Sequence, residues 1–376
     1  MDLQALRLYF RGLALLAALL LWGISVSNGT VKALLLAVYH RWLTDDIPLQ
    51  TKYTGIPLVD LPIALLVGFF FYGTNGSSSG YQYFLFDAYS TLQSAFVWLY
   101  VESFRVGAKP RWIAQPVIFG LLWQAFGAAI SLPLYYALHV EWLLQAPATD
   151  EVRIRGAVVI PIGFLLGAVV PAVIGMLPTW TGTASRSAIE HQYILALWQL
   201  DPLWVSWIQL ALGAVVSSLW RTGETTQQQS YLWVRGSYLL AAASSTVGHV
   251  YVILKALSDE TMSLWHMYVP SGFSGPSETD GILVRGPWLF LQYDLIIIAL
   301  SSLSWVFVLI CHAFDKDRLF SRAKVGLLLL VGAITIGPGG TVSLALFVRE
   351  AKLQRSRTKK IFPVCKDVKM RGPWGG

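Results

Sequence analysis

The feature that most constrains this chain is a long apolar run at residues 288–312, which reads WLFLQYDLIIIALSSLSWVFVLICH. A helix needs about 20 mostly apolar residues to cross a bilayer, so this run is long enough to span one. It carries one carboxylate, Asp294, beside the polar Gln292 and Tyr293. A carboxylate in hydrocarbon costs several kcal/mol and normally faces a protein interior or a cavity. Asp294 is therefore a candidate for chemistry, and a helix-end acid that bonds to a neighbouring helix is the alternative.

Further apolar runs occupy most of the chain. Only 13% of the residues are charged and 55% are hydrophobic, whereas a soluble domain carries about 25% charged residues. The run at 31–43 is too short to cross a bilayer and predicts an interfacial helix. We expect an all-α fold, a polytopic transmembrane helical bundle of about eight or nine spans. The expected spans are 10–27, 58–73, 84–104, 112–134, 155–177, 192–220, 232–256, 288–312 and 325–348.

Positive charge is concentrated at the C-terminus and contributes much of the net charge of +7. Cytoplasmic loops carry an excess of lysine and arginine, so this end is expected in the cytoplasm. We predict that residues 1–350 form one transmembrane domain and that 351–376 form a basic cytoplasmic tail. A basic tail beside a membrane favours contact with anionic lipid, and no nucleic-acid partner is expected.

The same charge rule predicts the sides on which the loops lie. Loops 28–57 and 105–111 are basic and are expected in the cytoplasm, with 74–83 on the far side. That far loop contains a glycosylation sequon at Asn75, and a second sequon at Asn28 falls on the cytoplasmic side. Both are modified only if the short run after Asn28 inserts. We predict a multi-pass protein of the endoplasmic reticulum with Asn75 and Asn28 as glycosylation candidates.

Absent motifs exclude several kinds of chemistry. The sequence has no Walker loop, no Rossmann glycine fingerprint and no His-Glu-x-x-His zinc helix. It also has no Gly-x-Ser-x-Gly nucleophile elbow. The six histidines are dispersed, so no metal site and no cofactor are expected. Nucleotide chemistry, metal-assisted ionisation of a diphosphate and serine hydrolysis are therefore disfavoured.

Polar residues inside the apolar runs supply the other site candidates. Glu102 precedes Arg105 by three positions, so the two can pair on one helix face, or Glu102 can serve as a site carboxylate. His249 lies deep in its run, either as an interhelical hydrogen-bonding partner or as an acid or base. Asp201 is followed by Pro202, a pair that favours the start of a new helical segment.

Two further pairs, Trp123–Gln124 and Trp198–Gln199, place an aromatic ring beside an amide within an apolar run. Aromatic faces stabilise cations, most strongly when they are desolvated. A carboxylic acid in an apolar wall holds its proton and can serve as a general acid. A carboxylic acid among aromatic rings suits the protonation of an epoxide or alkene in a lipid-soluble substrate. The carbocation that then forms would be stabilised by the faces of tryptophan and tyrosine rings.

Short motifs spread over most of 58–350 resemble fungal integral-membrane terpene cyclases that act late in meroterpenoid pathways, including those of ascochlorin and ascofuranone. The motifs are Glu-Ser-Phe-Arg at 102–105, Trp-Gln at 123–124 and 198–199, Phe-Leu-Gln-Tyr-Asp at 290–294 and Gly-Pro-Gly-Gly…Arg-Glu at 337–350. The resemblance implies an enzyme that opens a terminal epoxide with an acidic residue and cyclises a farnesyl chain on an aromatic polyketide. A tetrahydrofuran forms in one branch of the family and a cyclohexanone in the other.

The resemblance also implies which residues act. Relatives with fewer spans use one glutamate and one aspartate in different helices, and Glu102 and Asp294 match them by position. Asp294 is then the general acid, and Glu102 orients the substrate or takes up a proton. The residues expected to bind the substrate, an epoxidised prenylated phenol, are Gln292, His249, Trp198, Gln199, Trp123 and Gln124.

Two other classes stay open. A polytopic transporter or receptor-like protein would move or bind a solute and convert no terpenoid. The scarcity of charge within the spans counts against an ion-coupled carrier. A lipid or sterol-type isomerase would also use an acid among aromatic residues, and its product would keep an unopened chain.

Overall fold

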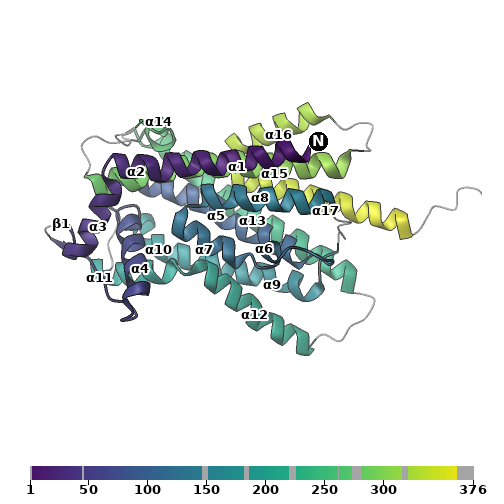
Figure 1. The fold of residues 1–376 in the computed structure, drawn as a ribbon, viewed down its shortest axis with the longest axis horizontal. Coiled ribbons are helices and arrows are strands. Elements are labelled where there is room, and N and C mark those ends of the chain that lie inside the picture. The colour runs from purple at the N-terminus through teal and green to yellow at the C-terminus, as the bar shows by residue number, and fades with distance from the viewer. Residues whose placement is uncertain are drawn as a thin grey trace, which may run out of the picture.

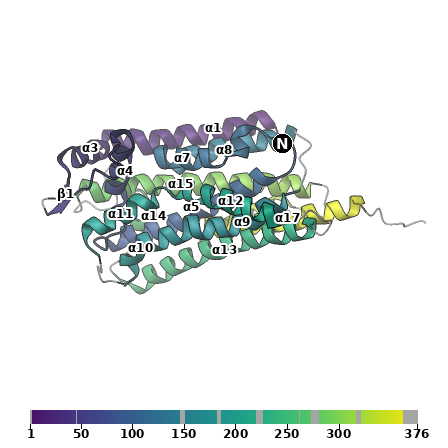
Figure 2. The same cartoon turned by 90° about the horizontal axis from the view of Figure 1, so that it is seen from below.

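Helices dominate this chain because apolar segments in lipid must satisfy their backbone hydrogen bonds internally. The computed structural model describes residues 2–44, 46–145, 151–181, 186–219, 226–260, 262–272, 281–315 and 321–361. Within these ranges the only sheet is a hairpin of β1 (Trp42–Thr44) and β2 (Ile47–Pro48). The expected all-α fold is confirmed. Most of the long helices run along one axis, and α17 extends beyond the others at one end (Figures 1 and 2).

The bounds of the helices follow the apolar runs. The first half of the chain contains α1 (Leu3–Ala18), the π-helix η1 (Leu19–Gly23), α2 (Ile24–Ser27), α3 (Thr30–His40), α4 (Pro57–Phe70), α5 (Ser79–Phe104), α6 (Arg111–Ala114), α7 (Val117–Phe126) and α8 (Ala128–Gln145). The second half contains α9 (Ile154–Phe164), the π-helix η2 (Leu165–Val169), α10 (Val170–Thr181), α11 (Ala188–Trp198), α12 (Asp201–Leu219), α13 (Thr226–Ser258), α14 (Leu264–Tyr268), α15 (Ile282–Phe314), α16 (Arg322–Thr335) and α17 (Pro338–Ile361).

Helix α5 is the central helix of the bundle. It packs against α9, α13, α15 and α17, and most of its residues are buried, including Asp87, Gln93 and Glu102. A helix enclosed by other helices has no lipid-facing surface, so it can carry polar residues that bond to its neighbours. The polarity of α5 therefore reflects its position in the fold.

The number of membrane spans is smaller than expected when length and composition are the criteria. Among the described residues, four helical stretches are long and apolar enough to cross a membrane: Leu3–Ser27, Ile154–Met176, Gln228–Ser258 and Ile282–Phe314. A fifth is present if α11 and α12 together form one bent span. The predicted eight or nine spans are not confirmed. Helices α4 and α7 are too short, and the polar residues of α5 keep it outside this set.

Two helix breaks lie inside the bundle. Helices α7 and α8 meet at Gly127, whose φ of 101° lies in a region that favours glycine. Helices α11 and α12 bend by 55° at a break before Asp201. Pro202 has no N–H to donate, and in a continuous helix its ring would clash with the carbonyl of Trp198, which accounts for a break here. The prediction that a new segment starts at Asp201 is confirmed.

The two ends of the bundle carry different loops. Gly286 packs directly against Thr30, and Gly80 packs against Trp288, so α3, α5 and α15 all begin at the same end. Loops 28–57 and 74–83 therefore share one end, and the prediction that they lie on opposite sides is wrong. The reason is that α3 and α4 lie across the end of the bundle and do not traverse it (Figure 1).

Both glycosylation candidates lie at that shared end. The Oδ1 atom of Asn75 accepts the backbone N–H and the hydroxyl of Ser77 at 3.0 and 2.7 Å. The Oδ1 atom of Asn28 accepts the same two groups of Thr30 at 3.1 and 2.7 Å. Ser77 is exposed, whereas Thr30 is buried. Asn75 is therefore the more accessible sequon of the two. The basic tail continues α17 as far as Ile361, and 362–376 lie outside the described residues.

Candidate active site

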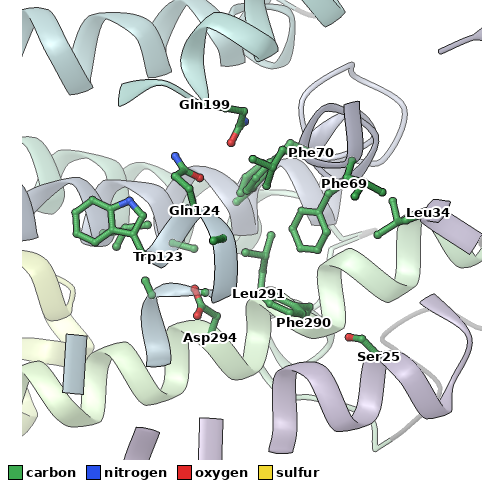
Figure 3. Close-up of a pocket in the computed structure, with 18 of the residues that line it drawn as sticks. Ser25, Leu34, Phe69, Phe70, Trp123, Gln124, Gln199, Phe290, Leu291 and Asp294 are labelled. Carbon is green, nitrogen blue, oxygen red and sulfur yellow. The ribbon is translucent and has the colours of Figure 1, made fainter. Parts of the chain in front are cut away.

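A cavity of about 410 Å³ lies within the bundle near the end that carries the sequons. Pockets for small organic ligands typically have volumes of about 300–1,000 Å³ and a few polar groups on apolar walls. This one is bordered by α2, α3, α4, α5, α7, α15 and the break between α11 and α12 (Figure 3). Its polar lining residues are Ser25, Thr30, Tyr89, Gln124, Gln199 and Asp294.

Asp294 lies on the wall of this cavity. It is 6% exposed, and its Oδ1 atom accepts the backbone N–H of Ala129 at 2.8 Å. Ala129 is in the first turn of α8, where backbone N–H groups have no partner within the helix. No ion pair to Asp294 exists among the residues that the structure describes. The sequence left two roles open for Asp294, a site acid and an acid that bonds to a neighbouring helix. The structure shows that Asp294 bonds to the first turn of α8 and also lines the cavity, so it does not exclude either role.

Gly127 makes this arrangement possible. A Cβ atom at position 127 would lie 2.6 Å from Cδ2 of Leu21 and 3.2 Å from Oδ1 of Asp294. Glycine is thus needed both for the positive φ and for the close approach. The break that it creates exposes the amino end of α8 within the bundle, and positive helix ends stabilise carboxylates.

Aromatic rings form a continuous chain along the cavity. Trp22 contacts Phe290, and Phe290 contacts Phe69, with centroids 5.8 and 5.3 Å apart. Phe69 and Phe70 are 4.9 Å apart. At the other end, Trp198 lies 5.6 Å from Phe70 and 4.8 Å from Tyr89. All these rings line the cavity. Phe290 is one helical turn from Asp294, so the chain begins beside the acid.

Two of the predicted polar residues lie across the cavity from Asp294. Gln124 and Gln199 are on the opposite side in Figure 3, and Trp123 is the neighbour of Gln124 on α7. Trp198 also lines the cavity. The structure therefore brings together Asp294 with both predicted Trp-Gln pairs, although these residues lie far apart in the sequence.

A second carboxylate, Asp201, lies directly behind this opposite wall. It is 1% exposed, and its Oδ1 atom accepts a bond from Nε2 of Gln124 at 2.9 Å. The hydroxyl of Tyr89 donates to its Oδ2 atom. The sequence predicts Asp201 only as the start of a helix, and nothing in it singles out Tyr89. The sequence does contain a signal for Asp201, because it is a second acidic residue within an apolar run and lies two positions after Gln199.

Glu102 lies outside the lining of this cavity. It is fully buried in an ion-pair cluster, where its Oε2 atom accepts from Nε of Arg105 and its Oε1 atom from Nη1 of Arg349, both at 2.8 Å. Arg105 also donates to Oε2 of Glu350 at 2.8 Å. Two acids and two arginines balance the charge. The pairing of Glu102 with Arg105 is as expected, and the structure does not bring Glu102 together with Asp294 in the cavity.

His139 completes the cluster around Glu102. Its Nε2 atom lies 3.0 Å from Oε2 of Glu102, and its Nδ1 atom accepts the indole N–H of Trp305 at 3.1 Å. A ring nitrogen that accepts a hydrogen bond carries no proton, so His139 is neutral and donates from Nε2. Every carboxylate oxygen of Glu102 thus has a donor.

His249 and Gln292 also lie outside the cavity lining. The Nδ1 atom of His249 is 2.9 Å from Oδ2 of Asp87, and its Nε2 atom is 3.2 Å from the carbonyl oxygen of Ile334. Gln292 donates from Nε2 to the carbonyl oxygens of His266 and Met267, both at 2.9 Å. It thereby fastens α14 onto α15. Neither residue is brought to Asp294.

Metal-binding geometry was not expected from the sequence. Within the described part of the chain, no group of three or more histidine, cysteine, aspartate or glutamate side chains is placed to hold a metal ion.

Comparison with known proteins identifies the family. The CtvD domain model matches residues 6–353. The chain belongs to the CtvD-domain family. Terpene cyclase DEP1 of Fusarium langsethiae is 28% identical over 351 residues, covering 89% of this chain and 95% of that relative. Terpene cyclase alnG of Emericella nidulans is 24% identical, with coverage of 91% and 93%. Terpene cyclase ascI of Acremonium egyptiacum is 23% identical, with coverage of 92% of each chain.

CtvD-domain membership confirms the resemblance drawn from the short motifs, since the matching relatives are fungal and are named terpene cyclases. No solved structure matches this chain.

Proposed function

We propose that this CtvD-domain protein is a terpene cyclase that protonates the terminal epoxide of a farnesylated aromatic polyketide and cyclises the terpenoid chain. The observation that supports this most is the position of Asp294, which is buried on the wall of an aromatic cavity and forms no ion pair with any described residue. The names of the relatives support the reaction class. They also favour an enzyme over a transporter or a sterol-type isomerase.

The first step is epoxide opening. The carboxylic acid of Asp294 gives its proton to the epoxide oxygen while the bond from that oxygen to the more substituted carbon breaks. The carboxylate that remains is stabilised by the N–H of Ala129 at the amino end of α8. Positive charge on the carbon is stabilised by the nearby faces of Phe290 and Phe69.

The second step is ring closure. In one outcome a hydroxyl of the substrate forms a C–O bond to the cationic carbon, giving a tetrahydrofuran. In the other, an internal alkene of the chain forms a C–C bond to the cationic carbon and closes a six-membered ring. Hydride and methyl shifts then move the charge to the carbon that bears the new hydroxyl, and loss of the hydroxyl proton gives a cyclohexanone. In both outcomes the hydroxyl proton leaves and returns to Asp294. Substrate and product then have the same mass, and the acid is regenerated without a metal ion or cofactor.

Glu102 has a structural role in this proposal. Both of its carboxylate oxygens already accept bonds from buried cations or from His139. A carboxylate held in this way is stabilised in its charged form, and it is not available to a substrate in the cavity.

The proposed membrane is the endoplasmic reticulum, with the sequon end in the lumen. Arg105, Lys109 and the basic part of α17 lie at the opposite end of the bundle. Cytoplasmic ends carry the excess of lysine and arginine, which supports this orientation. Glycosidase treatment of microsomal protein tests it, and Asn75→Gln should remove any shift in mobility that the treatment causes.

The activity test uses microsomes that contain the protein and a farnesyl phenol with a terminal epoxide. Wild-type microsomes should give a ring-closed product of unchanged mass. Asp294→Asn should give none while the protein remains present in the membrane. Solute uptake by reconstituted vesicles without any conversion would contradict the proposal.

A further inference from the structure

The wall of the cavity that faces Asp294 has a polar group of its own, which the reaction proposed above does not use. Asp201 is almost fully buried behind this wall and bonds to two residues that line the cavity. Nε2 of Gln124 donates to Oδ1 of Asp201 at 2.9 Å, and the hydroxyl of Tyr89 donates to Oδ2. Asp201 therefore fixes the orientation of both side chains.

These bonds determine what the two residues can offer a ligand. Tyr89 gives its one hydroxyl proton to Asp201, so its oxygen has only lone pairs left for another partner. Gln124 uses its amide nitrogen on Asp201, which leaves its Oε1 atom as an acceptor. Both residues are thus set as hydrogen-bond acceptors on the cavity wall.

Gln199 supplies the opposite chemistry on the same wall. It is 5% exposed, it lines the cavity, and its buried Nε2 atom has no hydrogen-bond partner among the described residues. A buried donor without a partner costs about 1–3 kcal/mol. Figure 3 shows Gln199 and Gln124 together on the side of the cavity opposite Asp294. The oxygen end of the amide points toward the cavity in the figure, and a half-turn of the amide about its Cγ–Cδ bond would present the Nε2 donor to a ligand oxygen there.

We propose that Tyr89, Gln124 and Gln199 form a head-group subsite for an oxygenated ring that carries a hydroxyl next to a carbonyl or ether oxygen. Tyr89 and Gln124 accept the hydroxyl proton, and Gln199 donates to the neighbouring oxygen. Asp201 is a positioning residue that sets the direction of the acceptors. This inference rests on the proposed cyclase function and adds the chemical class of the substrate's polar end.

The ring chain along the cavity connects the subsite to the acid. Tyr89 contacts Trp198 edge-to-face at one end, and Phe290 lies beside Asp294 at the other. A prenyl chain laid along these rings would have its polar head at Tyr89 and its epoxide at Asp294. The subsite thus determines which end of the substrate reaches the acid.

The test uses two non-reactive probes: a farnesyl phenol with an intact terminal alkene and an ortho carbonyl, and its phenol O-methyl ether. Binding of each tritiated probe to the purified protein in detergent micelles is measured by equilibrium dialysis. Wild-type protein should bind the phenol about tenfold more tightly than the ether, because the ether has no proton for the acceptors. In Tyr89→Phe this ratio should fall toward one.

Asp201→Asn gives a sharper result. The asparagine Oδ1 atom can still accept the hydroxyl hydrogen bond of Tyr89, but its Nδ2 group places N–H donors next to the amide nitrogen of Gln124. The amide of Gln124 must then turn, which places its N–H₂ group toward the cavity. The acceptor becomes a donor, so binding of the ether should be retained or improved while binding of the phenol falls. A purely structural role for Asp201 would lower the binding of both probes equally.

Tyr268→Phe is the matched control. Tyr268 also donates its hydroxyl to a buried aspartate, Asp87, at 2.6 Å, but it does not line the cavity. This variant should keep the wild-type ratio of phenol to ether binding.

Two results would overturn the subsite. The first is that Tyr89→Phe and Asp201→Asn both keep the wild-type ratio of phenol to ether binding. The second is that the wild-type protein does not bind the phenol probe. Failure of the proposed function is seen separately, as a wild-type protein that binds the alkene phenol but does not convert the corresponding epoxide.

Discussion

Glu102 and Asp294 are both buried acids on central helices, yet their surroundings differ. Glu102 is enclosed by Arg105, Arg349 and His139, and both of its oxygens accept from them. Asp294 has the backbone N–H of Ala129 and an apolar cavity beside it. A buried acid surrounded by cations is held in its charged form, whereas one beside an empty apolar space is available to a ligand. Burial alone therefore does not identify a catalytic acid.

The same contrast distinguishes the two ends of the bundle. The cluster around Glu102 ties α5, α8 and α17 together at the end where α17 extends outward (Figure 1). The cavity lies toward the other end, where helices are broken at Gly127 and before Asp201. Charge balance stabilises the first region, and helix breaks make room for a ligand in the second.

The largest expected effect is the loss of activity in Asp294→Asn. Asparagine can still accept the N–H of Ala129, so the helix cap is retained. The amide has no acidic proton to give, and general acid catalysis contributes about 10²–10⁴-fold in rate. Turnover of the epoxide in microsomes should fall by at least about a hundredfold, with little change in the thermal stability of the detergent-solubilised protein. Wild-type turnover in this variant would remove Asp294 from the mechanism.

Glu102→Gln should act on stability. Removing one charge leaves Arg105 and Arg349 buried with a single acid, and breaking a buried ion pair costs about 3–5 kcal/mol. The yield of folded protein and its unfolding temperature should fall, and kcat per folded molecule should stay near the wild-type value.

Arg105→Ala separates the two roles of Glu102. It disrupts the same cluster without touching the acid, so it should cause a comparable loss of stability. If Glu102→Gln were fully stable but inactive, and Arg105→Ala unstable but active, Glu102 would be catalytic and the comparison with Asp294 would be wrong.

Phe290→Leu should have a smaller effect on the region around Asp294. In the proposed reaction the ring faces developing positive charge, and such contacts contribute about 0.5–2 kcal/mol, which corresponds to roughly a 2- to 30-fold loss in kcat. Phe84→Leu is the matched control, because Phe84 is fully buried but does not line the cavity. The control should lower the unfolding temperature and leave kcat unchanged. Equal losses of kcat in both variants would indicate that packing, and not charge stabilisation, is the cause.

The sequence predicted the part of the cavity lining that lies on apolar runs. Asp294, Gln124 and Gln199 stand out because a polar side chain in a membrane helix must face a protein interior. Tyr89 and Phe69 could not be found in this way, since aromatic residues are common in such helices and nothing marks the ones that meet. Their roles depend on which helices lie side by side.

Partners that are distant in the sequence explain why some of the predicted site residues lie outside the cavity. His249 bonds to Asp87, which lies far away in the sequence, and the pair is separate from the cavity. Glu102 was recognised as a possible partner of Arg105, but Arg349 could not be foreseen. The predicted eight or nine spans are not confirmed for a related reason. Hydrophobic runs do not reveal that α4, which was expected to be a span, lies across the end of the bundle.

The smallest expected effect is that of a chelator. If Asp294 supplies the proton, wild-type turnover should be unchanged after dialysis against EDTA and unaffected by added Mg²⁺ or Zn²⁺. The described residues provide no group of three candidate ligands for a metal ion, and the proposed proton transfer needs none. Activity that falls on chelation and returns with Mg²⁺ would mean that a metal ion and not Asp294 polarises the epoxide. Measuring Asp294→Asn with added Mg²⁺ completes this test, because rescue of the variant would point to the same conclusion.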